Sequence, residues 1–178
     1  MTETRFSIHP INIKSIKLYI MKNATLIGLQ ESDCQNISEK LNILLANYSV
    51  FYQNTRGSHW NIKGDQFFTL HPKFEELYNS LVLKIDEIAE RILTLGATPA
   101  HNYSDYLQVS TIKESKEVSD GYKSVEIILE SFKVVIDLQR ELLDITDEAG
   151  DEGTNSQMSD YITEQEKEVW MYNSYLGK

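Results

Sequence analysis

Several features that define common classes of protein are scarce or missing in this sequence. The 178 residues contain one cysteine, Cys34, which excludes an internal disulfide framework and any CxxC metal or redox motif. Only three prolines and eight glycines are present, which favours long uninterrupted helices. No apolar run approaches the roughly 18 residues that a membrane-spanning helix needs. Glycine-rich phosphate loops and nucleophile elbows are also missing, so nucleotide-dependent enzymes and serine hydrolases lack support.

The composition is that of an acidic globular domain. Asp and Glu number 27 against 17 Lys and Arg, a formal net charge of −10, which argues against a surface devoted mainly to nucleic acid. The hydrophobic share of 41% and the length suit one domain with a substantial core. The single cysteine fits a reducing compartment, and we expect a cytoplasmic protein, with association with the nucleoid left open.

The N-terminal region differs in charge from the rest. Residues 1–30 carry four basic side chains and one acidic one. The apolar stretch 11–21 is broken by Lys14 and Lys17 and lacks a small-residue cleavage site, so we do not expect a signal peptide. We expect residues 1–32 to form a flexible extension, with Met21 as an alternative start, and residues 33–178 to form the folded domain.

Apolar residues at steps of three and four predict four long amphipathic helices. We expect them near residues 33–62, 71–95, 119–149 and 155–176, with a short helix near 104–109. The first and last links are short, and the middle link is long. This pattern predicts an all-α fold, a ferritin-like four-helix bundle with the short extra helix in the crossover between the second and third helices.

Polar residues and glycine mark the expected helix ends. Ser32 and Asp33 are candidate N-caps for the first helix, and Thr69 is a candidate for the second. Gly96, with Pro99 just beyond it, is a typical stop for the second helix.

The second expected helix carries four potential metal ligands on one face: His71, Glu75, Asp86 and Glu90. At about 100° per residue they fall within a band roughly 100° wide. Imidazole and carboxylate groups are common ligands of divalent metals. Glu75 and Asp86 are eleven residues apart, about 16 Å along a helix axis. One ion therefore cannot join them within a single helix.

The spacing of these four residues is palindromic. The outer pair and the inner pair share a midpoint between Ser80 and Leu81. Two copies of the helix, packed antiparallel about a two-fold axis there, would place the His71 end of one opposite the Glu90 end of the other. Such a contact creates two equivalent metal sites in a homodimer. The alternative is that these residues form an ordinary solvated acidic face.

Longer motifs surround these residues. They are HWNxxG from His59, LH ending at His71, and DEIAE from Asp86, with TDEAGD at 146–151 and WMY at 170–172. Over about residues 35–178 the sequence resembles the Dps family of mini-ferritins, named for DNA protection during starvation. The resemblance implies a ferroxidase centre between two-fold-related subunits. One subunit would supply His59, His71 and the carboxylate at position 75, and its mate would supply Asp86 and Glu90.

The resemblance also implies the chemistry. A ferroxidase of this kind oxidises Fe(II), preferentially with hydrogen peroxide, and stores ferric iron in a hollow dodecamer, with no organic cofactor. Position 75 is often Asp in the family, so Glu75 is one methylene longer. Trp60 resembles the family tryptophan beside the iron, although plain packing explains it equally well.

Iron entry and DNA binding are two further expectations from the resemblance. The acidic residues that match the family's iron-entry pore are Asp147, Asp151 and Glu152. Ser156 stands where some relatives carry an acidic residue, and a solvated acidic turn is the alternative. Family members that bind DNA often use a basic tail, which multiplies phosphate contacts in the assembly. The tail here has at most four basic residues, so direct DNA binding stays open.

Three functions therefore compete. The leading one is an iron-oxidising and iron-storing homo-oligomer that protects the cell and its DNA, with iron and peroxide as substrates and no membrane partner. The second is a nucleoid-compacting DNA-binding protein whose iron chemistry is secondary. The third is a structural helical oligomer whose metal site is vestigial or holds zinc.

Overall fold

Four long helices and one short helix make up the fold, seen in a computed structural model that describes residues 24, 26–116 and 118–177. The helices are α2 (Glu31–Asn61), α3 (Phe67–Thr94), α4 (Tyr103–Val109), α5 (Gly121–Ala149) and α6 (Glu152–Tyr175). No strand occurs in this part of the chain. Residues 1–23, which include Met21 and most of the expected extension, lie outside the described residues.

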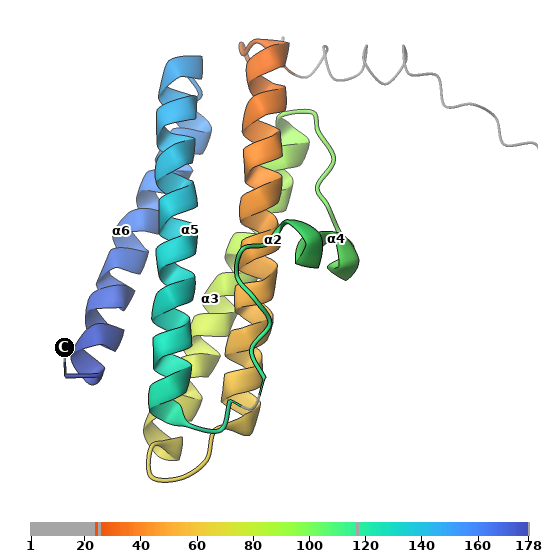
Figure 1. The fold of residues 1–178 in the computed structure, drawn as a ribbon. Coiled ribbons are helices and arrows are strands. Elements are labelled where there is room, and N and C mark those ends of the chain that lie inside the picture. Colours follow the sequence, from red (N-terminus) through yellow and green to blue (C-terminus); the bar gives the residue numbers. More distant parts are fainter. Residues whose placement is uncertain (1–23, 25, 117, 178) are drawn as a thin grey trace, which may run out of the picture.

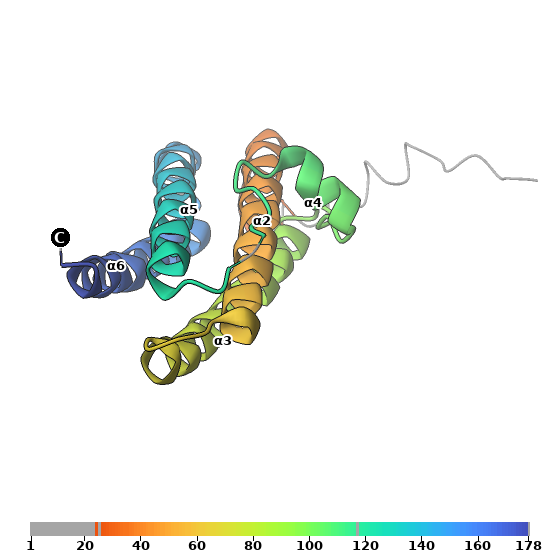
Figure 2. The same ribbon diagram turned by 60° about the horizontal axis from the view of Figure 1, so that its bottom comes forward.

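The helices form two hairpins that pack side by side. α2 pairs with α3, α5 pairs with α6, and α2 packs against α5 to join the two pairs (Figures 1 and 2). The long crossover from α3 to α5 passes across α2 and carries α4 against it. The predicted all-α bundle with one long crossover and a short crossover helix is confirmed. No helix in the described residues is long and apolar enough to cross a membrane.

The helix starts differ from the predicted caps. α2 begins one residue before Ser32, with Gln30 as its N-cap, and α3 begins two residues before Thr69, with Gln66 as its N-cap. Neither N-cap side chain makes a capping hydrogen bond. The caps proposed at Ser32, Asp33 and Thr69 are therefore wrong. The ends of α5 and α6 follow the usual chemistry, because Asp120 accepts from the Lys123 amide and Asp151 accepts from the Thr154 amide.

Gly96 ends α3 as predicted. It has a φ of +88°, a backbone conformation that residues with a Cβ rarely adopt. Its amide donates to the Leu93 carbonyl, which satisfies one of the last free acceptors of the helix.

The core lies between the two hairpins and is rich in aromatic residues. Phe51 on α2 and Phe132 on α5 are buried and meet edge to face, with ring centroids 5.1 Å apart. Tyr48 is also buried, and its hydroxyl accepts from the Gln139 amide of α5 at 2.6 Å and from the Gln165 amide of α6. This buried polar contact ties α2 to both helices of the second hairpin.

Candidate metal centre

His59 and His71 lie face to face where α2 ends and α3 begins. The short link between the helices brings them together, although they are twelve positions apart. Their ring centroids are 3.8 Å apart and the rings are nearly parallel, at 21°. His59 Nδ1 lies 2.8 Å from the His71 carbonyl oxygen, and His71 Nδ1 lies 2.9 Å from the His59 carbonyl oxygen. The two residues therefore hold each other through a reciprocal pair of hydrogen bonds.

These hydrogen bonds decide which ring nitrogen is available to a metal. A carbonyl oxygen only accepts, so each Nδ1 must carry the proton. In the neutral imidazole, Nε2 then keeps its lone pair free for a metal ion. A ring N–H held by a backbone carbonyl is the usual way in which proteins orient a ligating histidine. The donor chemistry of this pair therefore fits a divalent metal.

Aromatic side chains surround the two imidazoles. Phe67 stacks on His71 with ring centroids 4.8 Å apart, and Tyr78 meets His59 edge-on at 5.3 Å. His59 is 8% exposed, whereas His71 is half-buried. These ring contacts pack against both imidazoles and support the orientation that the hydrogen bonds set.

The three predicted carboxylate ligands lie on the exposed face of α3. Glu75 is one helical turn beyond His71, and its Oε1 accepts a long hydrogen bond of 3.4 Å from the Tyr78 hydroxyl. Asp86 and Glu90 are also exposed and form no ion pair with any described residue. The described residues contain no group of three or more His, Cys, Asp or Glu side chains able to hold a metal. One chain therefore brings the histidines together but not the whole predicted ligand set.

Tyr78 contacts both His59 and Glu75. Partial burial raises the pKa of its hydroxyl, and the negative charge of Glu75 raises it further. The hydroxyl therefore stays protonated at neutral pH and acts as a donor. On its other side the ring meets Tyr52 of α2 edge-on, with centroids 6.2 Å apart.

Trp60, the predicted near-site aromatic residue, lies on the surface beside His59. The residue is 57% exposed, and its ring stacks with the Arg56 guanidinium, whose central carbon is 4.5 Å from the ring centroid. Arg56 Nη1 also donates to the Tyr52 hydroxyl at 2.9 Å. The indole therefore belongs to a surface cluster with Arg56 and does not lie in the core.

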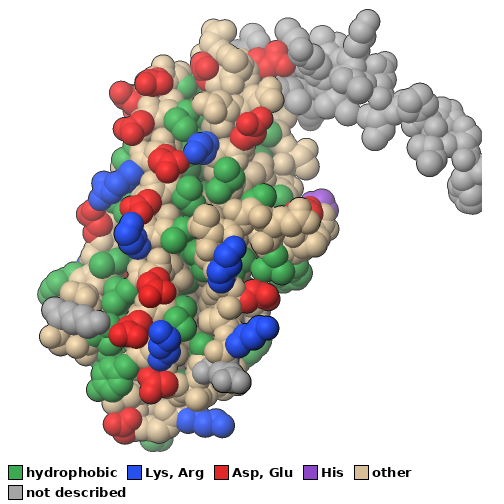
Figure 3. Space-filling model, viewed as in Figure 1, with side chains coloured by type: hydrophobic (Ala, Val, Ile, Leu, Met, Phe, Trp, Pro, Cys, Tyr) green, Lys and Arg blue, Asp and Glu red, His purple; other side chains and the backbone are tan. Residues whose placement is uncertain are grey.

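The predicted pore residues lie at the turn between α5 and α6, and they differ in exposure. Asp147 and Glu152 are exposed, whereas Asp151 is 2% exposed. Asp151 Oδ1 accepts from Arg91 Nη2 at 2.5 Å, and its Oδ2 accepts from the Thr154 hydroxyl at 2.5 Å. Figure 3 shows acidic side chains gathered at this end of the bundle. Asp147 and Glu152 present their charge to solvent, while the charge of Asp151 is paired within the chain.

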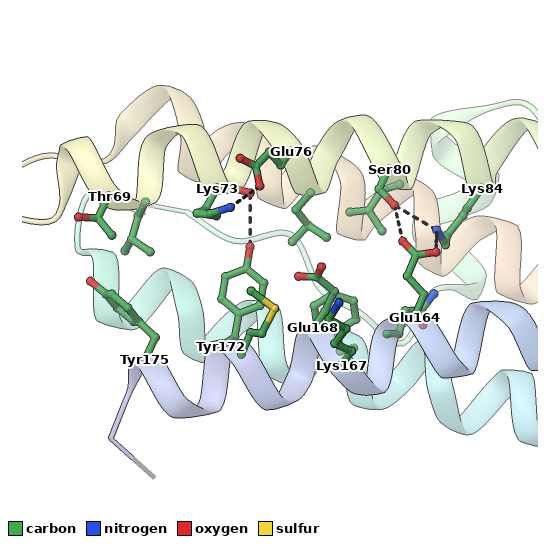
Figure 4. Close-up of a pocket in the computed structure, with 16 residues that line it drawn as sticks. Thr69, Lys73, Glu76, Ser80, Lys84, Glu164, Lys167, Glu168, Tyr172 and Tyr175 are labelled. Carbon is green, nitrogen blue, oxygen red and sulfur yellow. Dashed lines mark hydrogen bonds and ion pairs between the residues drawn. The ribbon is translucent and has the colours of Figure 1, made fainter.

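A cavity of about 410 Å³ separates the first half of α3 from the second half of α6. Figure 4 shows Glu164 reaching across from α6 to Ser80 and Lys84 on α3. Lys84 is buried, and its Nζ lies 2.7 Å from Glu164 Oε2 and 3.0 Å from Ser80 Oγ. On the α6 wall, desolvation raises the pKa of Glu168, and the charge of Glu164 adds to the shift.

Several residues that contact the predicted site residues or their neighbours were not expected from the sequence. Tyr78 and Tyr52 were not expected from the sequence to be site residues. Arg56 and the Arg91–Asp151 pair were not considered. The i,i+3 spacing of Glu75 and Tyr78 was a usable signal, because side chains three apart on a helix are neighbours.

The chain matches a known family over most of its length. The ferritin-like domain family matches residues 38–178. The DNA protection during starvation protein of Porphyromonas gingivalis is 39% identical over 151 residues, which covers 85% of this chain and 95% of the relative. DNA protection during starvation protein 2 of Bacillus anthracis is 36% identical over 144 residues, covering 81% of this chain and 99% of the relative.

Solved structures show the same relationship. The crystal structure of the Dps protein of Vibrio cholerae has a TM-score of 0.84 and 54% identity, covering 85% of this chain and 95% of that one. That protein is described as a member of a broad superfamily of ferritin-like diiron-carboxylate proteins. Dps from Staphylococcus aureus has a TM-score of 0.77 and 34% identity, covering 80% of this chain and 95% of that one. The predicted ferritin-like fold is thus confirmed, and the chain belongs to the Dps family of ferritin-like proteins.

Proposed function

We propose that this protein is a ferroxidase and iron store, a mini-ferritin that protects the cell and its DNA from oxidants. Two Fe(II) ions each give one electron to hydrogen peroxide, whose O–O bond breaks. Two protons are taken up, and the products are two Fe(III) ions and two water molecules. Because one peroxide accepts both electrons, no hydroxyl radical is released. The relatives named for DNA protection and the diiron-carboxylate description of the Vibrio cholerae protein support this chemistry.

The observation that carries the proposal is the reciprocal hydrogen bonding of His59 and His71. It leaves the Nε2 lone pairs of two adjacent imidazoles free for Fe(II) as substrate. Glu75 lies one turn away and supplies an anionic oxygen ligand. Imidazole with carboxylates suits Fe(II), and the carboxylates favour the higher charge of Fe(III) as it forms.

We further propose that Asp86 and Glu90 reach this site from a second subunit. The palindromic spacing about Ser80–Leu81 supports that arrangement, because it pairs each His71 end with the mate's Glu90 end. Next to the midpoint, Val82 is 41% exposed and Leu83 is 65% exposed. Exposed apolar side chains beside the proposed two-fold axis favour burial against another copy.

Storage requires a closed assembly and a route for iron. We propose a hollow dodecamer in the cytoplasm whose entry pores are lined by Asp147 and Glu152, with Asp151 at the same turn. Exposed carboxylates attract cations and raise their local concentration. Asp151 contributes mainly by holding the turn in place, because its carboxylate is bonded to Arg91 and Thr154.

Iron oxidation by variants tests the proposal. Fe(II) is mixed anaerobically with half an equivalent of peroxide, and the appearance of Fe(III) is followed by absorbance. We expect His59→Ala and Asp86→Ala each to lower the initial rate by at least about tenfold. The control His101→Ala changes an exposed crossover histidine and should match wild type. Equal rates in wild type and all three variants would contradict the assignment of the site residues.

We propose that DNA is protected through this iron chemistry and not by tight binding. The net charge of −10 repels the phosphate backbone. A gel-shift assay of the full chain at low salt should therefore show no retardation of a DNA duplex. Retardation that disappears with added salt would favour the nucleoid-compacting alternative.

A further inference from the structure

Tyr78 contacts two of the predicted ligands at the same time. Its hydroxyl lies 3.4 Å from Glu75 Oε1, and its ring edge meets His59 with centroids 5.3 Å apart and planes at 77°. Glu75 and Tyr78 come from α3, whereas His59 comes from α2. This tyrosine therefore bridges the imidazole part and the carboxylate part of the site.

The position of the Tyr78 ring is set by the other helix. The ring is held between His59 and Tyr52, both on α2, and it meets each of them edge-on. Tyr52 is itself fixed, because its hydroxyl accepts from Arg56 Nη1 at 2.9 Å. Both ring contacts come from α2, and together they place the Tyr78 hydroxyl beside Glu75.

A glutamate ligand at this position needs such a restraint. Glu75 is exposed and has one more rotatable bond than an aspartate. Ordering a free glutamate side chain costs conformational entropy. A hydroxyl bonded to Oε1 removes part of that freedom before the metal arrives, and it leaves Oε2 free as a ligand. Hydrogen bonds of this kind are often long in the ligand-free protein and shorten when the ligand binds.

We propose that Tyr78 is a positioning residue that orients the Glu75 carboxylate toward a metal ion held by His59 and His71. The inference rests on the proposed function, since it takes Glu75 as a ligand. It goes further by assigning a role to a residue that binds no metal itself. The tyrosine acts on Glu75 through its hydroxyl, and its ring keeps His59 in place.

Cobalt binding to the assembled protein tests the role without relying on iron oxidation. Co²⁺ affinity is measured by calorimetry, and the d–d absorption band reports the geometry of the bound ion. Tyr78→Phe keeps the ring and removes only the hydroxyl. We expect it to weaken Co²⁺ binding about threefold to tenfold and to shift the absorption band. Tyr103→Phe removes an exposed hydroxyl from α4 and should leave both readouts unchanged.

A double-mutant cycle separates positioning from a general structural effect. In a Glu75→Ala background, Tyr78→Phe should change Co²⁺ affinity by less than about twofold, because the carboxylate that it orients is missing. An equal effect in both backgrounds, or no effect in the wild-type background, overturns the inference. His59→Ala tests the site itself. Loss of Co²⁺ binding there, with Tyr78→Phe unchanged, overturns the positioning role alone, whereas unchanged binding in His59→Ala overturns the proposed function.

Discussion

His59 and His71 each donate a ring N–H to the backbone carbonyl of the other, at 2.8 and 2.9 Å, while their rings stack 3.8 Å apart. The contact joins the last turn of α2 to the first turns of α3. A single chain thus orients the two imidazoles, whereas Asp86 and Glu90 lie further along α3, away from the histidine pair. If a second subunit supplies Asp86 and Glu90, as proposed, the shared site has consequences that can be measured.

Mixed assemblies should recover activity that neither parent variant has. If His59 of one subunit and Asp86 of its mate form one site, a dimer of one His59→Ala subunit and one Asp86→Ala subunit contains one intact site and one doubly damaged site. Co-refolding the two inactive variants in equal amounts should therefore restore about a quarter of the wild-type rate of Fe(II) oxidation. The measurement is the initial rate per subunit.

The matched control for this experiment mixes His59→Ala with His71→Ala. Both residues belong to the same side of the predicted site, so a mixed dimer has two damaged sites and should stay inactive. Recovery in the control, or no recovery in the first mixture, would contradict a site shared across the two-fold axis.

The Arg91–Asp151 pair should be important for stability. Asp151 is buried, and Arg91→Ala would leave its carboxylate without a cation. We expect Arg91→Ala to lower the free energy of unfolding by about 3–5 kcal/mol, measured by urea denaturation at fixed protein concentration. The control Arg140→Ala breaks an exposed pair with Glu166 and should cost less than about 1 kcal/mol. Equal losses would show that burial of Asp151 does not set the cost.

Glu168 should make stability fall as the pH rises. Desolvation raises its pKa in the folded protein, and Glu164 adds to the shift, although Lys73 opposes it. Between the ordinary and the raised pKa, the folded state binds more protons than the unfolded state, so the free energy of unfolding decreases with increasing pH. Glu168→Gln removes this loss and should become increasingly more stable than wild type from mildly acidic to neutral pH.

The comparison for Glu168→Gln is Glu130→Gln, which removes one negative charge from an exposed position on α5. Urea denaturation over a pH series gives both profiles. A constant difference between Glu168→Gln and wild type at every pH would contradict the raised pKa.

The exposed acidic residues at the turn between α5 and α6 should speed iron uptake. In Asp147→Asn combined with Glu152→Gln, we expect the rate of iron deposition, after the oxidation sites are filled, to fall about tenfold at low salt. The difference should shrink at high ionic strength, because salt screens exposed charges. Asp105→Asn with Glu114→Gln removes two exposed charges from the crossover and is the control. Equal deposition rates at low salt would contradict entry at this turn.

Helix ends were harder to predict than helix interiors. The apolar residues Phe74, Leu81 and Ile88 recur along α3 and are all buried, as their spacing predicted. Periodicity works here because side chains that share one face of a helix become buried together. Ser32 and Thr69 are not N-caps, because α2 and α3 each begin before the polar residue that was expected to cap it.

The sequence by itself determined the number and nature of the long helices, the single crossover and the palindromic spacing of ligands along α3. All of these depend on residue spacing along one chain, and the helix converts spacing directly into direction. Only the tertiary structure decided which nitrogen of each histidine is free, that Tyr78 joins Glu75 to His59, and that Asp151 is paired with Arg91. Apart from Tyr78–Glu75, which lie one turn apart on α3, those contacts join different helices, and their geometry depends on how the helices pack. No local pattern in the sequence encodes that packing.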